Sequence, residues 1–394
     1  MRRWAASDVS TLTEGDAGTP VAADGAGYDS GVTTRQNAAM SDALAMVAPG
    51  RPLRDGLDRI LRAKRGGLVV VGDGPDVLSI CSGGFLLDAE FSPQRLSELA
   101  KMDGAIILAS DASRIARANV HLMPDPSIPT TETGTRHRTA ERVARSIDVP
   151  VLSVSAAMSV IAVYRNDLKH TVQPTGWLHD RTDQALATMQ RFRSRFDVAL
   201  GNLSILEVED TVSVGDVVHV IQTAEMVLRI GEEVDGYLVE LGEDGRLVSL
   251  QSAELSDGVA RALDLVIRDY AMMTRDEAAD RPAFEEWVVQ QLADLTSDEL
   301  RNPIRVAAVL RLPAVLNDTE SGIEPRGYRL LHHLPRLSDL IIERVVDRFE
   351  NLQHIMRASI AELEQVEGVG QARAASVKEG LARLAEASIF ERYQ

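Results

Sequence analysis

The sequence predicts an α/β domain with a mixed sheet flanked by helices, followed by an all-α connector and a helix-hairpin-helix domain. Short apolar runs alternate with helical patterns over residues 37–175, and helical patterns continue with few strand signals over 180–313. A Gly-Val-Gly turn between two helical stretches lies in residues 326–394. Residues 1–36 are rich in Gly, Ala, Asp, Ser and Thr without apolar periodicity, so we expect a disordered leader there.

Local signals place the elements of the α/β domain. Buried strands of such a domain are short apolar runs, and Ser92-Pro93 is typical of a helix start. The expected helices are 39–47, 54–63, 91–101 and one that follows Arg138. The expected strands are 68–72, 104–109, 116–122, 149–155, 160–164 and 170–172.

Apolar residues at three-and-four spacing predict helices through the rest of the chain. In the connector these are 184–200, 214–241, 255–273 and 283–293, and the expected linker is 313–326. Gly231, Gly236 and Gly242 are expected to weaken or end the second of these helices. The last domain is expected to hold helices at 330–346 and 352–363 before the glycine turn.

Composition narrows the class of protein. The chain has 394 residues, 45% hydrophobic and 4% aromatic, and no apolar run approaches the roughly 20 residues that span a bilayer. A single cysteine, Cys81, excludes an internal disulfide framework and a Cys-based zinc site. The net charge of −17 argues against generic binding to nucleic acid, although residues 325–394 hold ten basic and ten acidic side chains. We expect a cytoplasmic, nucleoid-associated protein without membrane attachment.

The most informative segment runs from Thr133 to Arg138 and reads Thr-Gly-Thr-Arg-His-Arg, directly before a strong helix former. The basic residues therefore lie at a loop-to-helix junction, where free backbone N–H groups and the helix dipole attract anions. Arginine adds a planar fork that binds phosphate oxygens two at a time. The segment predicts a polyphosphate site.

About 30 residues earlier, Asp103 and Gly104 lie at the entrance of an expected strand. A carboxylate in that position can hold a divalent metal or accept a proton from a hydroxyl, although a turn is the better explanation of Asp103 alone. One carboxylate paired with an arginine-rich anion loop suggests metal-assisted nucleotidyl transfer.

The C-terminal motif is the turn Gly368, Val369 and Gly370, with Ala374 four positions on. Glycines let the backbone approach a phosphate closely, and the next helix would direct its N-terminal N–H groups at it. Arg373 and Lys378 would add charge contacts. Such contacts do not distinguish bases, so the motif predicts sequence-independent DNA binding. The alternative is an ordinary helical hairpin with a glycine turn.

Asp103-Gly104-Ala105 together with Arg136-His137-Arg138 resembles the signature pair of the diadenylate cyclases, the cyclic di-AMP synthase family. Residues 118–122, 128–134 and 153–155 are similar to that family too. With the helical middle and the helix-hairpin-helix tail, residues 37–394 resemble the DNA integrity scanning proteins within the family. The resemblance implies a cyclase domain that converts two ATP into cyclic di-AMP and two pyrophosphates between facing subunits.

The resemblance also assigns roles to residues of this chain. It implies that Asp103 holds Mg²⁺ or Mn²⁺ and activates the 3′-hydroxyl, and that Arg138 supports the loop or the leaving pyrophosphate. For His137, neutral hydrogen bonding and general-acid action remain open. The implied ATP-binding residues are Gly104, Leu122, Thr133, Gly134, Thr135, Arg136, His137 and Ser155.

For partners, the resemblance implies a homo-octamer of two tetramers that meet through their cyclase domains. It also implies that DNA, in particular branched structures and recombination intermediates, suppresses the cyclase activity. The implied biological context is DNA damage and DNA repair. One alternative is a non-enzymatic DNA-binding scaffold that only senses ATP. A weaker one is a nucleotidyltransferase that adds AMP to a separate acceptor.

Overall fold

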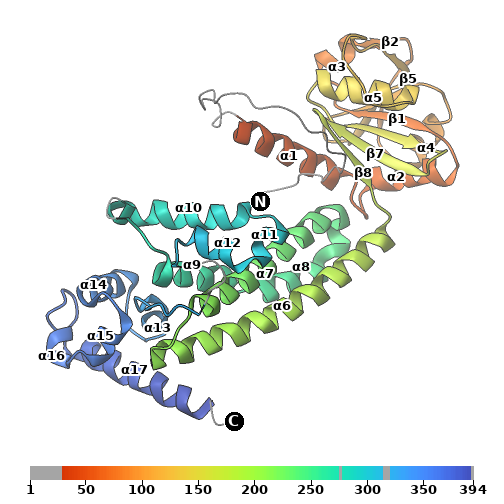
Figure 1. Ribbon diagram of the computed structural model, residues 1–394. Helices are drawn as coiled ribbons and strands as arrows, with labels where there is room; N and C mark the ends of the chain where they lie inside the picture. The colour runs from red at the N-terminus through yellow and green to blue at the C-terminus, as the bar shows by residue number, and fades with distance from the viewer. Residues whose placement is uncertain (1–28, 275–276, 314–319, 392–394) are drawn as a thin grey trace, which may run out of the picture. The chain divides into compact units, whose positions relative to one another are not determined.

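The computed structural model describes residues 29–274, 277–313 and 320–391, which form two compact units (Figure 1). Unit 1 comprises the residues up to Asp183 together with Val234–Leu250, and unit 2 comprises Gln184–Glu233 and the residues from Gln251 on. The division differs from the expected domain bounds because helix α6 (Thr175–Glu209) runs from one unit into the other.

Helix α1 (Asp29–Met46) begins inside the segment expected to be a disordered leader. The expectation is therefore wrong for residues 29–36, while residues 1–28 lie outside the described part of the chain. Met40, Ala43 and Leu44 are buried in the core of unit 1. Once packing holds these turns, each further N-terminal residue adds a hydrogen bond without a new nucleation cost, so the helix extends beyond the apolar pattern.

Unit 1 is built on one mixed sheet with the strand order β2-β5-β4-β1-β6-β7-β8, and β3 also pairs with β5. Only the β1–β4 pair is parallel among the described strands. The strands are β1 (Gly67–Val71), β2 (Cys81–Ser82), β3 (Phe85–Glu90), β4 (Ala105–Leu108), β5 (Arg114–Leu122), β6 (Val151–Ser155), β7 (Val160–Arg165) and β8 (Leu168–Val172).

Helices cover both faces of this sheet. Val69 and Val71 of β1 face the core formed with α1, α2 (Pro52–Arg62) and α4 (Pro93–Leu99). Leu68 and Val70 face the opposite core, formed with α3 (Pro75–Ser79) and α5 (Thr135–Ser146). Figure 1 shows α3 and α5 together on one side of the sheet and α2 on the other. Because successive side chains alternate between faces and both faces are buried, these strands read as continuous apolar runs.

Three elements of unit 1 were not expected from the sequence: α3, β2 and β3. Strand β3 is mostly exposed, with Phe85 and Leu86 open to solvent. It therefore lacks the buried apolar run by which most of the other strands are predicted. Strand β2 contains only two residues. Helix α5 begins at Thr135 rather than after Arg138, so the basic residues occupy its first turn instead of preceding it.

Unit 2 is helical. Helix α7 (Val214–Leu241) continues through Gly231 and Gly236 and ends before Gly242, where φ is +55°. Of the three glycines, only Gly242 ends the helix. The other helices that follow α6 are α8 (Arg246–Ser256), α9 (Val259–Tyr270), α10 (Arg281–Asp294), α11 (Ser297–Arg301), α12 (Pro303–Val309), α13 (Tyr328–His332), α14 (Asp339–Phe349), α15 (Leu352–Arg357), α16 (Ile360–Leu363) and α17 (Gln371–Glu391), with 3₁₀ turns η1 (Gly242–Gly245) and η2 (Glu277–Asp280).

Three stretches expected to be single helices are broken. Gly258, at φ +72°, separates α8 from α9, and the turn that contains Arg336, at φ +69°, separates α13 from α14. Ser359 forms a capping box with Glu362 and starts α16 after α15. Left-handed residues and capping side chains end helices even where the apolar spacing continues.

A buried polar cluster joins the connector helices to the C-terminal helices within unit 2. The Arg329 guanidinium donates to both Glu207 carboxylate oxygens, at 2.9 and 3.1 Å, and the Tyr270 hydroxyl donates to Glu207 at 2.7 Å. Asp269 accepts three backbone N–H groups at the start of α13, from Gly327, Tyr328 and Arg329. These bonds tie α6, α9 and α13 together.

The C-terminal helices contain two hairpins with the same backbone pattern. In one, α13 and α14 are joined by a turn with Arg336 at φ +69°, and in the other α16 and α17 are joined by a turn with Gly368 at φ +89°. Each second helix begins three residues after the left-handed residue. Both hairpins contribute to one apolar core. Within the described residues, no helix is long and apolar enough to cross a membrane.

Candidate functional site

The candidate site is centred on the N-terminus of α5 in unit 1. Gly134 is the N-cap residue, and no side chain caps the first backbone N–H groups there. The first helical hydrogen bond runs from Arg138 N–H to Gly134 O at 2.8 Å. The N–H groups of Thr135, Arg136 and His137 precede that bond, so they remain available to an anion, which the helix dipole also favours.

Asp103 and Arg136 meet directly. Arg136 Nη2 donates to Asp103 Oδ1 at 2.5 Å, and the Asp103 side chain is 94% exposed. The same guanidinium passes over Gly66, where an added Cβ would lie 2.5 Å from Arg136 Nη1 and 3.3 Å from Val154 O. Gly66 therefore gives Arg136 the space to reach Asp103. The carboxylate and the arginine-rich helix end, separate in the sequence, form one surface.

Gly104 has a packing role next to Asp103. A Cβ on Gly104 would collide with the backbone of Asn119, and it would lie 2.7 Å from the Val120 nitrogen. Asn119 itself has φ +55°, at an irregularity in the β4–β5 pairing. On the other side lies Gly84, which has φ +82°. A Cβ added to Gly84 would lie 2.9 Å from the Asn119 carbonyl oxygen. Two glycines thus admit the bulged β5 strand beside the site.

His137 is buried and belongs to a chain of polar contacts. Its Nδ1 lies 2.8 Å from the Tyr164 hydroxyl, which donates to Glu132 Oε1 at 3.0 Å. Lys169 Nζ lies 2.5 Å from the same Glu132 oxygen. Burial lowers the pKa of His137, so the ring is neutral near pH 7. Burial and the neighbouring Glu132 raise the pKa of Tyr164, which stays protonated.

The loop before α5 is held by side chains of the helix itself. Arg138 Nε donates to Glu132 O at 2.8 Å, and Arg142 Nε donates to Ile128 O at 2.9 Å. Arg145 donates to Pro129 O at 2.5 Å, and the buried Glu141 carboxylate accepts the Thr131 N–H at 3.1 Å. These contacts fix the approach to the Thr-Gly-Thr turn. Arg138 supports the loop in this structure.

The remaining expected ATP-binding residues differ in their exposure. Thr133 and Thr135 are exposed, and Gly134 lies between them at the N-cap. Leu122 ends β5, opposite Cys81 of β2, and is partly buried. Ser155 ends β6 directly after Val154, and its hydroxyl accepts the Met158 N–H at 3.3 Å.

Sequence reasoning missed Gly66, Glu132, Tyr164 and Lys169 as parts of the site. Tyr164 carried a usable signal, since it is a tyrosine in an otherwise apolar expected strand. The hydroxyl of a buried tyrosine needs a hydrogen-bond partner, so a polar group had to lie opposite it. Gly66 carried no such signal, because only the folded structure brings Arg136 over it.

The C-terminal turn residues lie together in the second hairpin. Val369 is buried, Gly368 has φ +89°, and Gly370 has open space where a side chain would be. The two expected charge contacts are engaged within the protein: Arg373 donates to Gly368 O at 2.7 Å, and Lys378 donates to Met356 O at 2.6 Å. Arg373 and Lys378 therefore brace the turn and the preceding helices.

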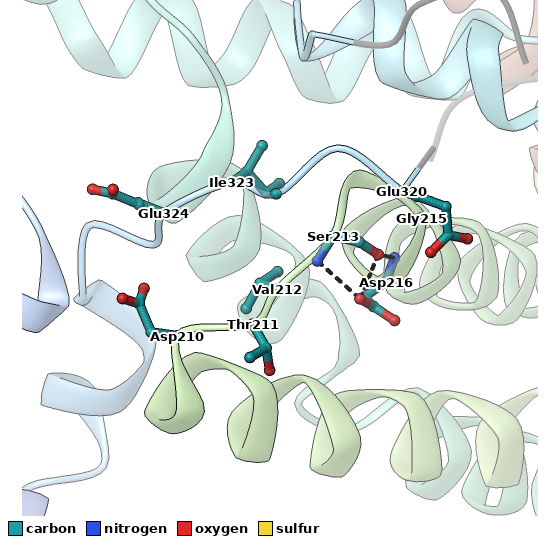
Figure 2. A pocket seen from close by; sticks show the side chains of 10 residues that line it. Asp210, Thr211, Val212, Ser213, Gly215, Asp216, Glu320, Ile323 and Glu324 are labelled. Atoms are coloured by element: carbon teal, nitrogen blue, oxygen red, sulfur yellow. Dashed lines mark hydrogen bonds between the residues drawn. The ribbon is translucent and has the colours of Figure 1, made fainter. Parts of the chain in front are cut away.

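A hollow of about 670 Å³ in unit 2 is a poor site for phosphate (Figure 2). Four carboxylates line it, from Asp210, Asp216, Glu320 and Glu324, and none of the described residues that line it is basic. Asp216 accepts the Ser213 N–H at 2.9 Å. Because carboxylates repel a triphosphate, the helix end in unit 1 is the better anion site.

Two family models match successive parts of the chain. Residues 54–168 match the family model described as DisA bacterial checkpoint controller nucleotide-binding, and residues 172–318 match the model described as DisA bacterial checkpoint controller linker region. The first of these segments contains Asp103, Arg136 and Tyr164. The nucleotide-binding segment and the linker segment thus follow one another in the same order as the α/β sheet and the helices after it.

Curated relatives match along most of the chain. A protein of Kineococcus radiotolerans is 50% identical over 89% of this chain and 96% of its own length. One of Acidothermus cellulolyticus is 51% identical over 89% and 94%, and one of Streptomyces avermitilis is 47% identical over 92% and 96%. Each is named DNA integrity scanning protein DisA. The chain therefore belongs to the family of DNA integrity scanning proteins, the DisA bacterial checkpoint controllers.

Proposed function

We propose that this chain is a diadenylate cyclase that condenses two ATP into cyclic di-AMP and two pyrophosphates. The observation that carries the proposal is the direct contact of Asp103 with Arg136 at the uncapped start of α5. A triphosphate placed on the free N–H groups would meet Arg136, and its nucleoside end would lie within reach of the Asp103 carboxylate. That arrangement suits attack of a hydroxyl on a phosphorus atom.

The site of one chain supplies one carboxylate and one anion-binding helix end, which suffices for one ATP. A cyclic product with two equivalent halves suits a two-fold symmetric pair of such sites. We infer that two unit 1 surfaces face each other, so that each 3′-hydroxyl attacks the α-phosphorus of the opposite nucleotide. Both phosphodiester bonds form with loss of one pyrophosphate each. The proposed assembly is a homo-octamer.

A divalent metal, Mg²⁺ or Mn²⁺, fits the residues present in a limited way. The described residues hold no group of three His, Cys, Asp or Glu side chains arranged to bind a metal by themselves. Asp103 is nevertheless highly exposed at the anion site. Mg²⁺ is commonly held by one or two carboxylates together with substrate phosphates. The metal would neutralise phosphate charge when bound, and Asp103 would be its ligand from the chain.

We also propose that the C-terminal helices form a helix-hairpin-helix domain that binds DNA and regulates the cyclase. The two hairpins share the left-handed turn residue and the same onset of the second helix. The exposed backbone around Gly370 leaves room for a phosphate, and binding would be independent of sequence. Branched DNA is the proposed ligand, and suppression of activity is the proposed effect. The relatives are named DNA integrity scanning proteins, which supports DNA as the class of ligand.

The decisive experiment incubates the full chain with ATP and Mg²⁺ or Mn²⁺ and identifies the products by mass spectrometry. Cyclic di-AMP is the expected product. A folded, ATP-binding protein that yields no cyclic dinucleotide would favour a scaffold that only senses ATP. Linear adenylated products would instead point to transfer of AMP to a separate acceptor.

A further inference from the structure

The His137 ring has one edge toward the core of unit 1 and the other toward the anion-binding turn. Nδ1 lies 2.8 Å from the Tyr164 hydroxyl. Cδ2, the carbon bonded to Nε2, lies 3.4 Å from the position that a Cβ on Gly134 would occupy. Nε2 is therefore on the side of the ring next to the N-cap of α5, while Nδ1 is committed to the core.

The hydrogen bonds around Tyr164 decide which nitrogen carries the proton. Tyr164 has a single hydroxyl proton, which it donates to Glu132 Oε1 at 3.0 Å. The Glu132 carboxylate can only accept, and it also receives Lys169 Nζ. The Tyr164 oxygen can therefore only accept from His137. It follows that Nδ1 bears a hydrogen and that a neutral His137 ring has none on Nε2.

This protonation pattern matters for an anionic ligand. An Nε2 without hydrogen presents a lone pair, which repels a phosphate oxygen, and it becomes a donor only when the ring takes up a second proton. The charged groups that face the ring are Glu132, Lys169 and Arg136, with the Tyr164 hydroxyl. Without a ligand, burial together with Lys169 and Arg136 lowers the pKa of His137 despite Glu132. A triphosphate would reverse that balance.

We propose that Tyr164, held by Glu132, is a positioning residue that fixes the Nδ1–H form of His137, so that His137 binds a nucleoside triphosphate through Nε2 as an imidazolium. One proton moves from the solvent to Nε2 when the nucleotide binds, and no other bond forms or breaks. The inference rests on the proposed function only for the class of ligand.

The test measures proton uptake on binding. The full chain is titrated with 3′-deoxy-ATP and Mg²⁺, an analogue without the attacking hydroxyl, by calorimetry in buffers of different ionisation enthalpy. The wild type is expected to take up more protons than His137→Gln, by a large fraction of one proton per site. The glutamine amide can donate a hydrogen bond to the phosphate without taking up a proton. The affinity of the wild type for the analogue is expected to fall by up to about tenfold per pH unit above the pKa of the free His137 ring.

Tyr164→Phe removes the acceptor that holds hydrogen on Nδ1, so a neutral ring can carry it on Nε2 instead. Proton uptake is expected to fall toward the His137→Gln value, and the pH dependence of affinity to flatten. Tyr237→Phe is the matched control, since Tyr237 is also buried in unit 1 but lies on α7. It is expected to keep the wild-type proton uptake. Thermal melting of each variant reports whether it is folded.

Nitrogen-15 spectra of labelled histidine give a second readout that needs no Tyr164 variant. The His137 resonances, identified from their loss in His137→Gln, are expected to show hydrogen on Nδ1 in the free wild type. A free protein with hydrogen on Nε2 overturns the inference. So does a wild type that takes up no more protons than His137→Gln, or a folded Tyr164→Phe that takes up as many as the wild type.

Product analysis with ATP separates this inference from the proposed function. Linked proton uptake without any cyclic di-AMP would overturn the proposed reaction and leave the role of Tyr164 standing. Cyclic di-AMP formed without linked uptake would overturn the role of Tyr164 alone. A folded wild type that does not bind the analogue at all would overturn both.

Discussion

Arg136 Nη2 lies 2.5 Å from Asp103 Oδ1, although the two residues are 33 positions apart in the chain. This contact depends on two further features: the missing side chain at Gly66, over which the guanidinium passes, and the end of α5, which carries Arg136. A strand entrance and a helix N-terminus are thereby joined into one charged surface. The residues of this surface lead to separate predictions for activity and for stability.

Asp103→Asn is expected to lower the rate of cyclic di-AMP formation by about 10²–10⁴-fold or more. The amide neither accepts the hydroxyl proton nor binds a metal well. Stability should hardly change, since an exposed ion pair contributes about 0–1 kcal/mol. Mass analysis of products and a melting curve measure the two effects. The matched control is Asp298→Asn, an aspartate with the same 94% exposure that pairs with Arg301. Normal turnover by Asp103→Asn would contradict the assignment.

Gly66→Ala is expected to lower activity without unfolding the protein. The new Cβ would lie 2.5 Å from Arg136 Nη1, which is the end of a flexible side chain and can move away. Arg136 would then leave Asp103 and the bound triphosphate, so we expect a higher KM for ATP and a melting temperature close to the wild type. Gly176→Ala, which meets nothing within 4 Å, is the control. An unchanged KM would show that Arg136 does not depend on this space.

Gly104→Ala should act in the opposite way, mainly on stability. Its Cβ would strike the Asn119 backbone and the Val120 nitrogen, and backbone cannot move aside as a side chain can. Overpacking of this kind costs typically about 1–3 kcal/mol, and the β4–β5 pairing would shift. Urea unfolding of Gly104→Ala beside Gly66→Ala measures the difference. Equal stabilities would mean that the β5 bulge adapts freely.

The sequence predicts part of this site, for reasons that particular residues make clear. Asp103 could be proposed only together with Arg136 and His137, because a turn explains the aspartate alone and the arginine-rich helix start is what indicates an anion site. Glu132, Lys169 and Gly66 could not, because their roles come from contacts that only the sheet and α5 bring together. Gly231 misled in the same way: α7 continues through it, and a Cβ added there would lie 3.3 Å from Ser256 Oγ, so the glycine gives room to a neighbouring helix that the sequence does not show.

Arg329→Met tests the buried cluster of unit 2. The change leaves the Glu207 carboxylate buried without its cation, which costs about 3–5 kcal/mol when one partner of a buried pair is removed. Adding Glu207→Leu should recover part of that loss, because it removes the carboxylate with which Arg329 pairs. Chemical unfolding measures each step. Arg261→Met is the control, since Arg261 pairs with Asp339 at the surface and should change stability by less than about 1 kcal/mol.

Gly370→Leu separates DNA binding from catalysis in the C-terminal hairpin. Gly368 is the worse choice for this experiment, because at φ +89° any side chain strains the turn. At Gly370 an added Cβ meets nothing within 4 Å, so leucine should fit while it blocks the approach of a phosphate to the start of α17. We expect DNA affinity to fall at least about tenfold, in line with the loss of about 1.4 kcal/mol of binding free energy.

Basal cyclic di-AMP formation by Gly370→Leu should stay at the wild-type level. Gly201→Leu, on α6 and equally open, is the control. Fluorescence anisotropy with branched and linear DNA measures the affinity, and equal binding by Gly370→Leu and the wild type would place the DNA contact elsewhere.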